Sequence, residues 1–292
     1  MTIDISSMTV SQIRKLTVAE IGTLGTADVS AFSAEKVAAL NAKQLNAFTT
    51  TSFVSFKSDQ ISAITATALR GLDPTQIAAL ESGHIQGLTN KQAAVLTGAQ
   101  VATFTTGEVE ALSASQISAL GYDVFTTFDS AEIALFTTAE VAAISPKAIS
   151  GLATGTIAGL STAKVAVLTS GQVAALSAAQ LNAFSSTQLA SLDANTFKAL
   201  TAKQLSGLDT KQIAALGTSQ LAAIEAKNIA SLTSKQAAAL STAQVEALNS
   251  AQIAALNKAV FTTFNSAELA LFTTAEVAAI SDKVISSLTT AA

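Results

Sequence analysis

Apolar residues recur along this chain every eight residues, in a register that holds from one end to the other. Every residue whose number is a multiple of eight, from Met8 to Leu288, is Leu, Ile, Phe or Met. Three residues earlier, from Ile5 to Ile285, lies a second apolar residue, which is reduced to Ala in two octads. The chain therefore contains 36 octads without insertion or deletion. This pattern predicts a single continuous repeat domain over residues 1–292.

A polar residue opens each octad and fits the start of a capped helix. With the octad positions numbered one to eight, position one is usually Ser, Thr, Asn, Asp or Gly, and position four is mostly Gln or Glu, as in LSTAQVEALNSAQIAAL (240–256). Ser or Thr followed three residues later by Gln or Glu forms the capping box of a helix N-terminus. Positions eight and five then become the two partners of a hydrophobic staple. Both prolines, Pro74 and Pro146, fall at position two, the first helical position, where a missing N–H costs nothing.

We predict an all-α fold, a solenoid or superhelix of very short capped helices with one helix per octad. In one continuous helix, eight residues would advance about 800°, so the apolar pair would drift by about 80° per octad and form no lasting stripe. A β-solenoid remains the alternative, although positions five and eight would then point to opposite faces of a strand. Positions six and seven are largely Ala, Ser, Thr or Gly, which allows neighbouring backbones to approach closely. Because one octad cannot fold alone, neighbouring octads must stabilise each other.

A slower repeat overlies the octads. The segment 124–145 returns as the segment 260–281, shifted by a whole number of octads, and both segments are rich in Phe. We interpret the Phe-rich octads as places of special geometry: a thicker core, a contact between superhelical turns, or a contact with another copy. Duplication without a functional role is the alternative. The candidate assembly contacts are Phe53, Phe56, Phe125, Phe128, Phe136, Phe261, Phe264 and Phe272.

Composition narrows the classes of function. The chain has no Cys, which removes disulfides, zinc-thiolate sites and thiol catalysis. Its net charge of -4 gives no basic stripe, so we expect no nucleic-acid partner. No run of about 18 apolar residues occurs, so we expect no membrane span.

No pattern of catalytic or ligand-binding residues stands out. The sequence contains no Gly-rich nucleotide loop, no metal-ligand spacing and no nucleophile motif, so we expect no enzyme activity, no cofactor and no metal site. The lone histidine, His84, replaces Gln at position four and fits a helix cap. Tyr122, at position two, fits an exposed residue of a first helical turn. Acidic residues gather at position four, where the helix N-terminus favours them.

The motifs STAQVEAL (241–248), TSGQVAAL (169–176) and TTAEVAAI (137–144) carry a family resemblance. Over its whole length the chain resembles the tandem Ser/Thr-x-x-Gln-Val/Ile-x-x-Leu arrays of large bacterial surface and secreted proteins described as adhesin-like. The resemblance implies an extracellular or cell-surface location in a bacterium and a structural or adhesive role, and it names no binding residues. The N-terminal segment MTIDISSM has no basic region and no long apolar region, so we expect export without a recognisable N-terminal signal peptide.

We expect a structural protein that assembles with itself, as the subunit of an extracellular or cell-surface filament or layer. Solenoids ordinarily carry terminal repeats with polar outer faces, whereas the first and last octads here keep their apolar positions. Head-to-tail contacts that do not close produce filaments. The alternative is a solenoid binding or adhesion module that recognises a surface protein or a glycan.

Overall fold

The computed structural model describes residues 3–286 and shows an all-helical protein. Within these residues each octad contains one helix of three to six residues, and no strand occurs. The predicted helical solenoid is therefore confirmed, and the β-solenoid alternative is wrong. The chain has two compact units, of which one ends at Leu152 and the other begins at Ala153. A single continuous domain over the whole chain stays a prediction.

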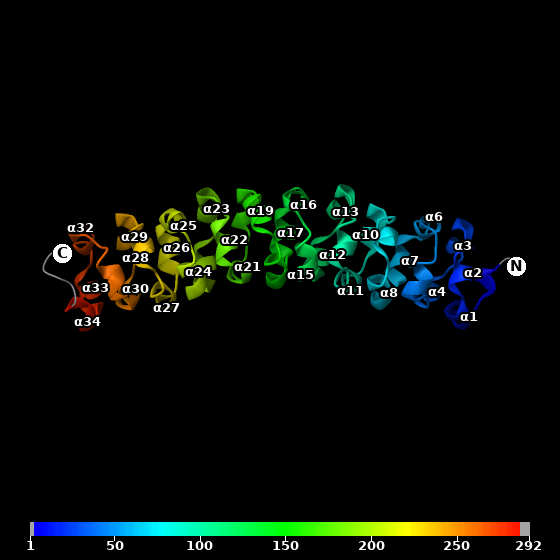
Figure 1. Ribbon diagram of the computed structural model, residues 1–292, viewed down its shortest axis with the longest axis horizontal. Coiled ribbons are helices and arrows are strands. Elements are labelled where there is room, and N and C mark those ends of the chain that lie inside the picture. Colours follow the sequence, from blue (N-terminus) through cyan, green and yellow to red (C-terminus); the bar gives the residue numbers. More distant parts are fainter. Residues whose placement is uncertain (1–2, 287–292) are drawn as a thin grey trace. The chain divides into compact units, whose positions relative to one another are not determined.

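The helices of each unit follow one another in chain order (Figure 1). The first unit contains η1 (Ile5–Ser7), α1 (Val10–Lys15), α2 (Val18–Ile21), α3 (Thr26–Ser30), α4 (Ala34–Ala38), α5 (Ala42–Leu45), α6 (Thr50–Phe53), α7 (Ser58–Ala63), α8 (Ala66–Arg70), α9 (Pro74–Ile77), α10 (Ser82–Gly87), α11 (Asn90–Ala93), α12 (Gly98–Val101), α13 (Thr106–Glu110), α14 (Ala114–Ala119), α15 (Tyr122–Phe125), α16 (Ser130–Leu135), α17 (Thr138–Ala143) and α18 (Pro146–Ile149). The second unit contains α19 (Thr154–Ala158), α20 (Thr162–Ala166), α21 (Ser170–Ala175), α22 (Ala178–Asn182), α23 (Ser186–Ala190), η2 (Ala194–Ala199), α24 (Ala202–Ser206), α25 (Thr210–Ala215), α26 (Thr218–Ala223), α27 (Ala226–Ile229), α28 (Ser234–Ala237), α29 (Thr242–Glu246), α30 (Ser250–Ala255), α31 (Lys258–Phe261), α32 (Ser266–Leu269), α33 (Thr274–Ala279) and α34 (Asp282–Ile285). Apart from η1, each of these helices begins at position two of its octad.

The octad starts a helix because its own side chains satisfy the free amides of the first turn. In α14, Ser113 Oγ accepts a hydrogen bond from the Gln116 N–H at 3.3 Å, and Gln116 Oε1 accepts one from the Ser113 N–H at 2.8 Å. This reciprocal pair is the predicted capping box. Pro74 and Pro146 occupy the first position of α9 and α18, as predicted. A helix-start signal repeated every eight residues therefore produces a new helix every eight residues.

Each helix ends at position five, six or seven of its octad, without any special backbone geometry. In α14 the Leu120 N–H donates to the Ile117 carbonyl at 3.2 Å, and Leu120 has φ -60° and ψ 143°. No described residue has a positive φ. The chain changes direction between helices because the residues at positions eight and one are extended, and all L-residues adopt this conformation easily. The glycines are therefore not needed for turns.

The side chains of positions five and eight form the apolar core of each unit. From Ile5 to Phe261, every residue at position five is 0–2% exposed. The helices that enclose this core lie three octads apart in sequence, such as α7 with α10 in the first unit and α27 with α30 in the second. Contact between helices three octads apart shows that the chain winds into a superhelix within each unit.

Glycines at position seven lie where successive turns approach most closely. A Cβ atom added to Gly71 would lie 2.6 Å from Ala42 Cβ, and one added to Gly207 would lie 2.6 Å from Ala178 Cβ. Neither glycine has a positive φ, so close approach is the physical reason for Gly at these two sites.

Glutamine at position four joins each turn to the preceding one. Gln116 Nε2 donates to the Ile85 carbonyl at 2.7 Å and to the Leu88 carbonyl at 2.8 Å, which reaches back 31 and 28 residues. We call this set of bonds to residues 28 positions earlier the Gln ladder. Its members include Gln44, Gln60, Gln76, Gln92, Gln100, Gln116, Gln188, Gln204, Gln212, Gln220, Gln236, Gln244 and Gln252. Since the helices pack three octads apart and the ladder reaches 28 residues back, one superhelical turn spans between three and four octads.

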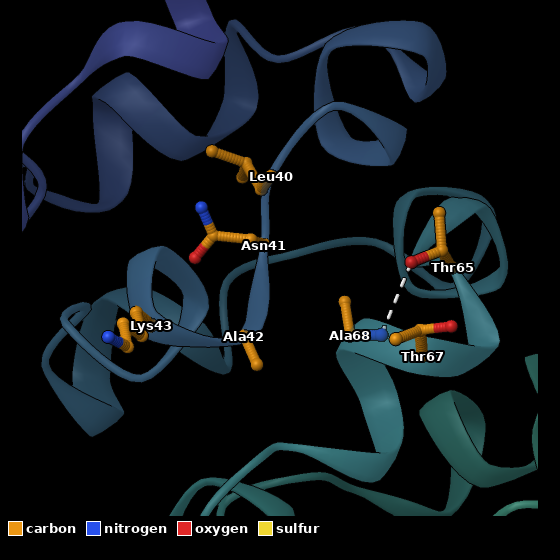
Figure 2. Close-up of a pocket in the computed structure, with 7 residues that line it drawn as sticks. All are labelled: Leu40, Asn41, Ala42, Lys43, Thr65, Thr67 and Ala68. Carbon is orange, nitrogen blue, oxygen red and sulfur yellow. Dashed lines mark hydrogen bonds between the residues drawn. The ribbon is translucent and has the colours of Figure 1, made fainter.

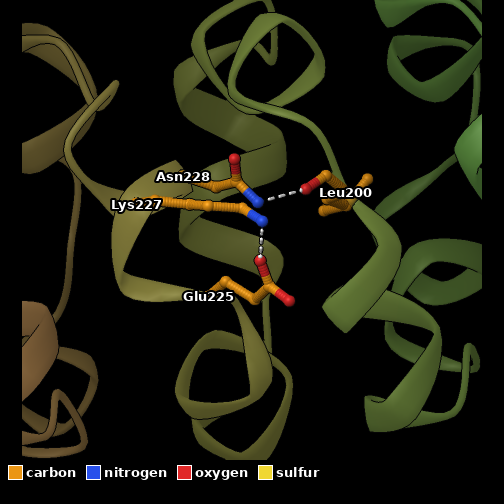
Figure 3. A network of polar contacts seen from close by, with 4 residues as sticks. All are labelled: Leu200, Glu225, Lys227 and Asn228. Atoms are coloured by element: carbon orange, nitrogen blue, oxygen red, sulfur yellow. Dashed lines mark hydrogen bonds and ion pairs between the residues drawn. The ribbon is translucent and has the colours of Figure 1, made fainter.

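Other donors replace Gln in the ladder. Ser52 Oγ donates to the Leu24 carbonyl at 2.8 Å, and Asn228 Nδ2 donates to the Leu200 carbonyl at 2.8 Å. Figure 3 shows Asn228 directed at Leu200 across the gap between turns, whereas Lys227 of the same helix is directed at Glu225. The Lys227–Glu225 ion pair is solvent-exposed and contributes little to stability. Position four therefore requires a side-chain donor more than it requires Gln.

Removing a ladder side chain should destabilise the protein more than removing a cap alone. Gln116→Ala leaves the Ile85 and Leu88 carbonyls without their donor, which should cost about 1–3 kcal/mol of unfolding free energy. Gln12 caps α1 through Oε1, but no described residue accepts from its Nε2. Gln12→Ala should therefore cost less, about 0.5–1 kcal/mol. Urea denaturation followed by circular dichroism measures both, and equal losses would contradict the ladder.

Two glycines should respond in opposite directions to a methyl group. Gly71→Ala should destabilise the protein by about 1–3 kcal/mol, because the new Cβ would clash with Ala42. The double variant Gly71→Ala, Ala42→Gly should recover most of this loss. Gly155→Ala in α19 should stabilise by about 0.5–1 kcal/mol, because no atom lies within 4 Å of the added Cβ. Thermal denaturation of the three variants tests the assignment; a destabilised Gly155→Ala would refute it.

Candidate functional site

The phenylalanines predicted as assembly contacts lie inside the fold. Exposed fractions are 0% for Phe53, 1% for Phe56, 0% for Phe125, 3% for Phe128, 2% for Phe136, 1% for Phe261 and 5% for Phe264. Phe272 alone is half-buried. The ring centroids of Phe128 and Phe136 lie 5.5 Å apart in an edge-to-face contact, as expected for packed aromatic side chains. The seven buried rings offer no surface to another copy, whereas Phe272 keeps part of its surface exposed.

Two further phenylalanines pack against Phe56, which also contacts Phe53, and complete a cluster of four rings. Phe32 and Phe48 pack edge to face with Phe56, at centroid distances of 6.1 Å and 5.3 Å. The sequence feature that could have identified them is the recurrence of Phe at position eight in nearby octads. Phe32 and Phe56 stand three octads apart, which is the separation of helices that pack on one another. This cluster therefore joins one turn to the next, as expected if the Phe-rich octads form a contact between superhelical turns.

The last described turn of the second unit exposes apolar side chains. Val277 is 45% exposed and Ile285 is 46% exposed, whereas position five is 0–2% exposed from Ile5 to Phe261. Figure 1 places α32, α33 and α34 together at this end of the unit. No described helix lies three octads further on, where it would cover these side chains. We call the group formed by Leu269, Phe272, Val277 and Ile285 the apolar end face.

The first turn carries acidic residues at position four. Asp4, Glu20 and Asp28 stand there beside Gln12. The Thr17 N–H donates to Glu20 Oε2 at 2.7 Å, and this hydrogen bond holds the pKa of Glu20 below its usual value. Hydrogen bonds from the Ser6 and Ser7 side chains likewise lower the pKa of Asp4. Carboxylates stand at position four in both turns, since the last turn carries Glu268 and Glu276 there. The two turns differ at position five, where the first turn buries its apolar residues and the last turn exposes Val277 and Ile285.

Two surface pockets occupy equivalent octad positions, one in each unit. Both lie between an octad and the octad three repeats later. The first has a volume of about 420 Å³ and is lined by Leu40, Asn41, Ala42, Lys43, Thr65, Thr67 and Ala68 (Figure 2). The second has a volume of about 430 Å³ and is lined by Ser206, Leu208, Asp209, Thr210, Lys211, Thr233, Lys235 and Gln236. A third pocket of about 540 Å³ lies at the first turn, between Asp4 and Glu20.

His84 and Tyr122 take the places expected from the sequence. His84 Nδ1 accepts from the Glu81 N–H at 2.9 Å, and His84 Nε2 lies 2.7 Å from the Phe56 carbonyl oxygen. The ring therefore reproduces both bonds of a ladder Gln, and only 8% of the residue is exposed. Tyr122 is 46% exposed at the start of α15.

The described part of the chain shows no ready site for metal chemistry. Within it, no three His, Cys, Asp or Glu side chains come together in a way that could hold a metal ion. None of its helices is long and apolar enough to cross a membrane. The features that remain as candidate functional surfaces are the apolar end face and the pockets between turns.

Glu108 stands at position four, but its side chain cannot make the ladder bond to the preceding turn. It is 4% exposed, and its Oε2 accepts from the Thr105 N–H at 2.6 Å. The carbonyl that a ladder donor at this position would reach belongs to Leu80, and no described residue donates to it. A carboxylate has no N–H to supply.

Glu108→Gln should therefore stabilise the protein, by about 0.5–1.5 kcal/mol, since the new Nε2 can donate to the Leu80 carbonyl. Glu20→Gln is the control, because the described residues include no carbonyl 28 positions before Glu20 and the exchange keeps its capping acceptor. Differential scanning calorimetry at neutral pH should show a higher melting temperature for Glu108→Gln alone. An equal or lower melting temperature would show that Leu80 has no need of this donor.

The comparison with known families matches one segment of the repeat. The ALTTAQ repeat family matches residues 221–258. This segment contains ALSTAQ (239–244) and ALNSAQ (247–252), each spanning the end of one octad and the start of the next. It also supplies three consecutive ladder residues, Gln236, Gln244 and Gln252. No curated protein matches the chain. The chain is thus a tandem repeat protein with a segment similar to ALTTAQ repeats.

Proposed function

We propose that the protein is a structural subunit that assembles with itself, in an extracellular or cell-surface filament or layer. The observation that carries this proposal is the apolar end face. Val277 and Ile285 stand at octad position five and are nearly half exposed. Elsewhere in the unit, the residues at position five are covered by the following turn. Exposed apolar side chains grouped in one place mark contact surfaces.

The occupant of the end face is the first turn of a second copy. Inside each unit, the side of a turn that carries the position-four side chains packs on the preceding turn. The first turn presents this same side, with Gln12 Nε2 free to donate. Contact between two different surfaces of two copies generates a filament whenever the arrangement does not close into a ring.

This contact is expected to be weaker than the contact between turns inside a unit. Glu20 and Asp28 occupy ladder positions in the first turn, and their carboxylates cannot donate to carbonyl groups of another copy. Weak end contacts favour reversible assembly that depends on concentration. The extracellular location is supported by the resemblance of the octads to those of bacterial surface and secreted proteins.

A solenoid that displays a binding surface is the second candidate function. The recurrence of a pocket at equivalent octad positions, beside Ala68 and beside Gln236, favours it. Lys211, Lys235 and Asp209 give the second pocket charged groups of both signs. A surface protein or a glycan is the expected partner in this case.

Charge placed on the end face should prevent assembly. Val277→Asp and Ile285→Asp should each shift the protein from large assemblies to monomers, by at least about tenfold in the concentration needed, because burying an unpaired carboxylate is unfavourable. Thr274→Asp is the matched control, since it adds the same charge to an exposed position of α33. Light scattering with size-exclusion chromatography and negative-stain electron microscopy measures the assemblies.

Two outcomes separate the possible arrangements. Glu20→Gln should strengthen assembly if the first turn of another copy covers the end face, and should leave it unchanged if two end faces cover each other. Wild-type protein that stays monomeric over the concentration series would refute self-assembly and leave the binding module as the function to pursue.

A further inference from the structure

The duplication extends beyond the Phe-rich segments and includes a contact between turns. Asn46 Nδ2 donates to the Gly71 carbonyl at 2.9 Å, and Asn46 Oδ1 accepts from the Asp73 N–H at 2.9 Å. The shift that relates the Phe-rich segments also relates Asn46 to Asn182. Asn182 repeats both bonds at the same lengths, with Gly207 and Asp209 as partners. The two regions therefore hold their turns together in the same way.

One of the positions at which these two regions differ is a position of the Gln ladder. In the second region Gln204 completes the ladder: its Nε2 donates to the Leu176 carbonyl at 2.7 Å and the Val173 carbonyl at 2.9 Å, and its Oε1 accepts from the Thr201 N–H at 2.9 Å. In the first region its counterpart is Ala68, which has no such side chain.

The backbone groups that Gln204 satisfies in the second region are left without partners in the first. The counterpart of the Leu176 carbonyl is that of Leu40, and the counterpart of the Thr201 N–H is that of Thr65. No described residue donates to the Leu40 carbonyl or accepts from the Thr65 N–H. One acceptor and one donor thus face a place that holds a carboxamide in the duplicate.

The spacing between the two turns is not reduced beside Ala68. An added Cβ at Gly71 would lie 2.6 Å from Ala42 Cβ, and the duplicate pair Gly207 and Ala178 gives the same 2.6 Å. The spacing between turns is therefore the same with Ala68 as with Gln204. A pocket of about 420 Å³ lies here, and its lining includes Leu40, Thr65 and Ala68. Because a pocket of about 430 Å³ also lies beside Gln236, whose ladder bonds are complete, the empty ladder place is marked by the unpaired groups and the unchanged spacing and not by the pocket alone. Figure 2 shows Leu40 and Ala42 on one side of it, with Thr65 and Ala68 on the other.

At Ala148 the two turns lie too close together to leave a similar space. This residue is also an Ala at position four, three residues before a Gly. An added Cβ at Gly151 would lie 2.7 Å from the backbone oxygen of Tyr122, so at this turn the backbone itself comes close. The combination of unpaired groups and undiminished spacing therefore distinguishes the pocket at Ala68 from the equivalent place at Ala148.

We propose that the pocket beside Ala68 binds a primary carboxamide, the terminal group of a glutamine side chain presented by a partner polypeptide. The amide oxygen accepts from the Thr65 N–H, and the amide NH₂ donates to the Leu40 carbonyl, as Gln204 does between its own turns. The methyl groups of Ala42 and Ala68 contact the aliphatic part of the ligand. A carboxylate is rejected because it cannot donate to the Leu40 carbonyl, and a tertiary amide because it has no N–H. This site does not depend on self-assembly.

The test uses propionamide, with propionate and N,N-dimethylpropionamide as controls of nearly the same shape. Each compound is titrated into ¹⁵N-labelled full-length protein, and the amide signals of Thr65 and Thr201 are followed by NMR. The wild-type Thr65 signal should shift and saturate with propionamide, at roughly millimolar affinity, and the two controls should give no saturable shift.

Two variants exchange the properties of the duplicated places. Ala68→Gln fills the pocket from within, so the Thr65 shift should disappear and the Thr65 amide should exchange with solvent more slowly. Gln204→Ala opens the duplicate, so a saturable shift should appear at Thr201; should this variant not fold, the comparison of wild type with Ala68→Gln decides the question. Absence of a saturable Thr65 shift in the wild type, or an equal shift in Ala68→Gln, would overturn the proposal.

Discussion

The hydrogen bond from the position-four side chain to the turn before it is the interaction on which this structure depends. A helix as short as those of this chain leaves most of its carbonyl groups without partners inside the helix. At position eight the carbonyl is buried against the next turn and needs a donor. Gln meets this need and caps its own helix at the same time, because a carboxamide both accepts and donates. Two requirements from different turns are therefore satisfied by one side chain, as in Gln116.

The exceptions to this rule show that the turns are held by more than the ladder. Val124 and Val260, which are counterparts in the duplication, stand at position four and are fully buried beside Phe125 and Phe261. At these places apolar packing takes the place of the hydrogen bond. At Glu108 and Ala68 the side-chain donor is missing, and no other described group takes its place. Since neighbouring repeats supply most of the stability, an array of this kind tolerates a few incomplete members.

The two ends of the described chain differ in a way that bears on function. The first turn carries carboxylates at ladder positions and buries its position-five residues, whereas the last turn exposes Val277 and Ile285. This difference is the basis of the proposed contact with the octads of another copy. Of the eight phenylalanines predicted as assembly contacts, Phe272 belongs to the apolar end face, whereas the other seven rings are enclosed by the fold.

The sequence by itself determined the helix starts, the core positions and the absence of strands from the described residues. These features depend on residues three to eight positions apart, whose physical chemistry is local: a cap such as Ser113 with Gln116 forms within one octad. Burial of the Phe rings and the second bond of each Gln could not be predicted, because both depend on which octads become neighbours. That registry, between three and four octads per turn, arises from close packing of small residues such as Gly71 against Ala42 and from the ladder across 28 residues. The open place beside Ala68 became visible only when the tertiary structure set it against Gln204, because the spacing between turns decides whether a missing side chain leaves a pocket or is closed over.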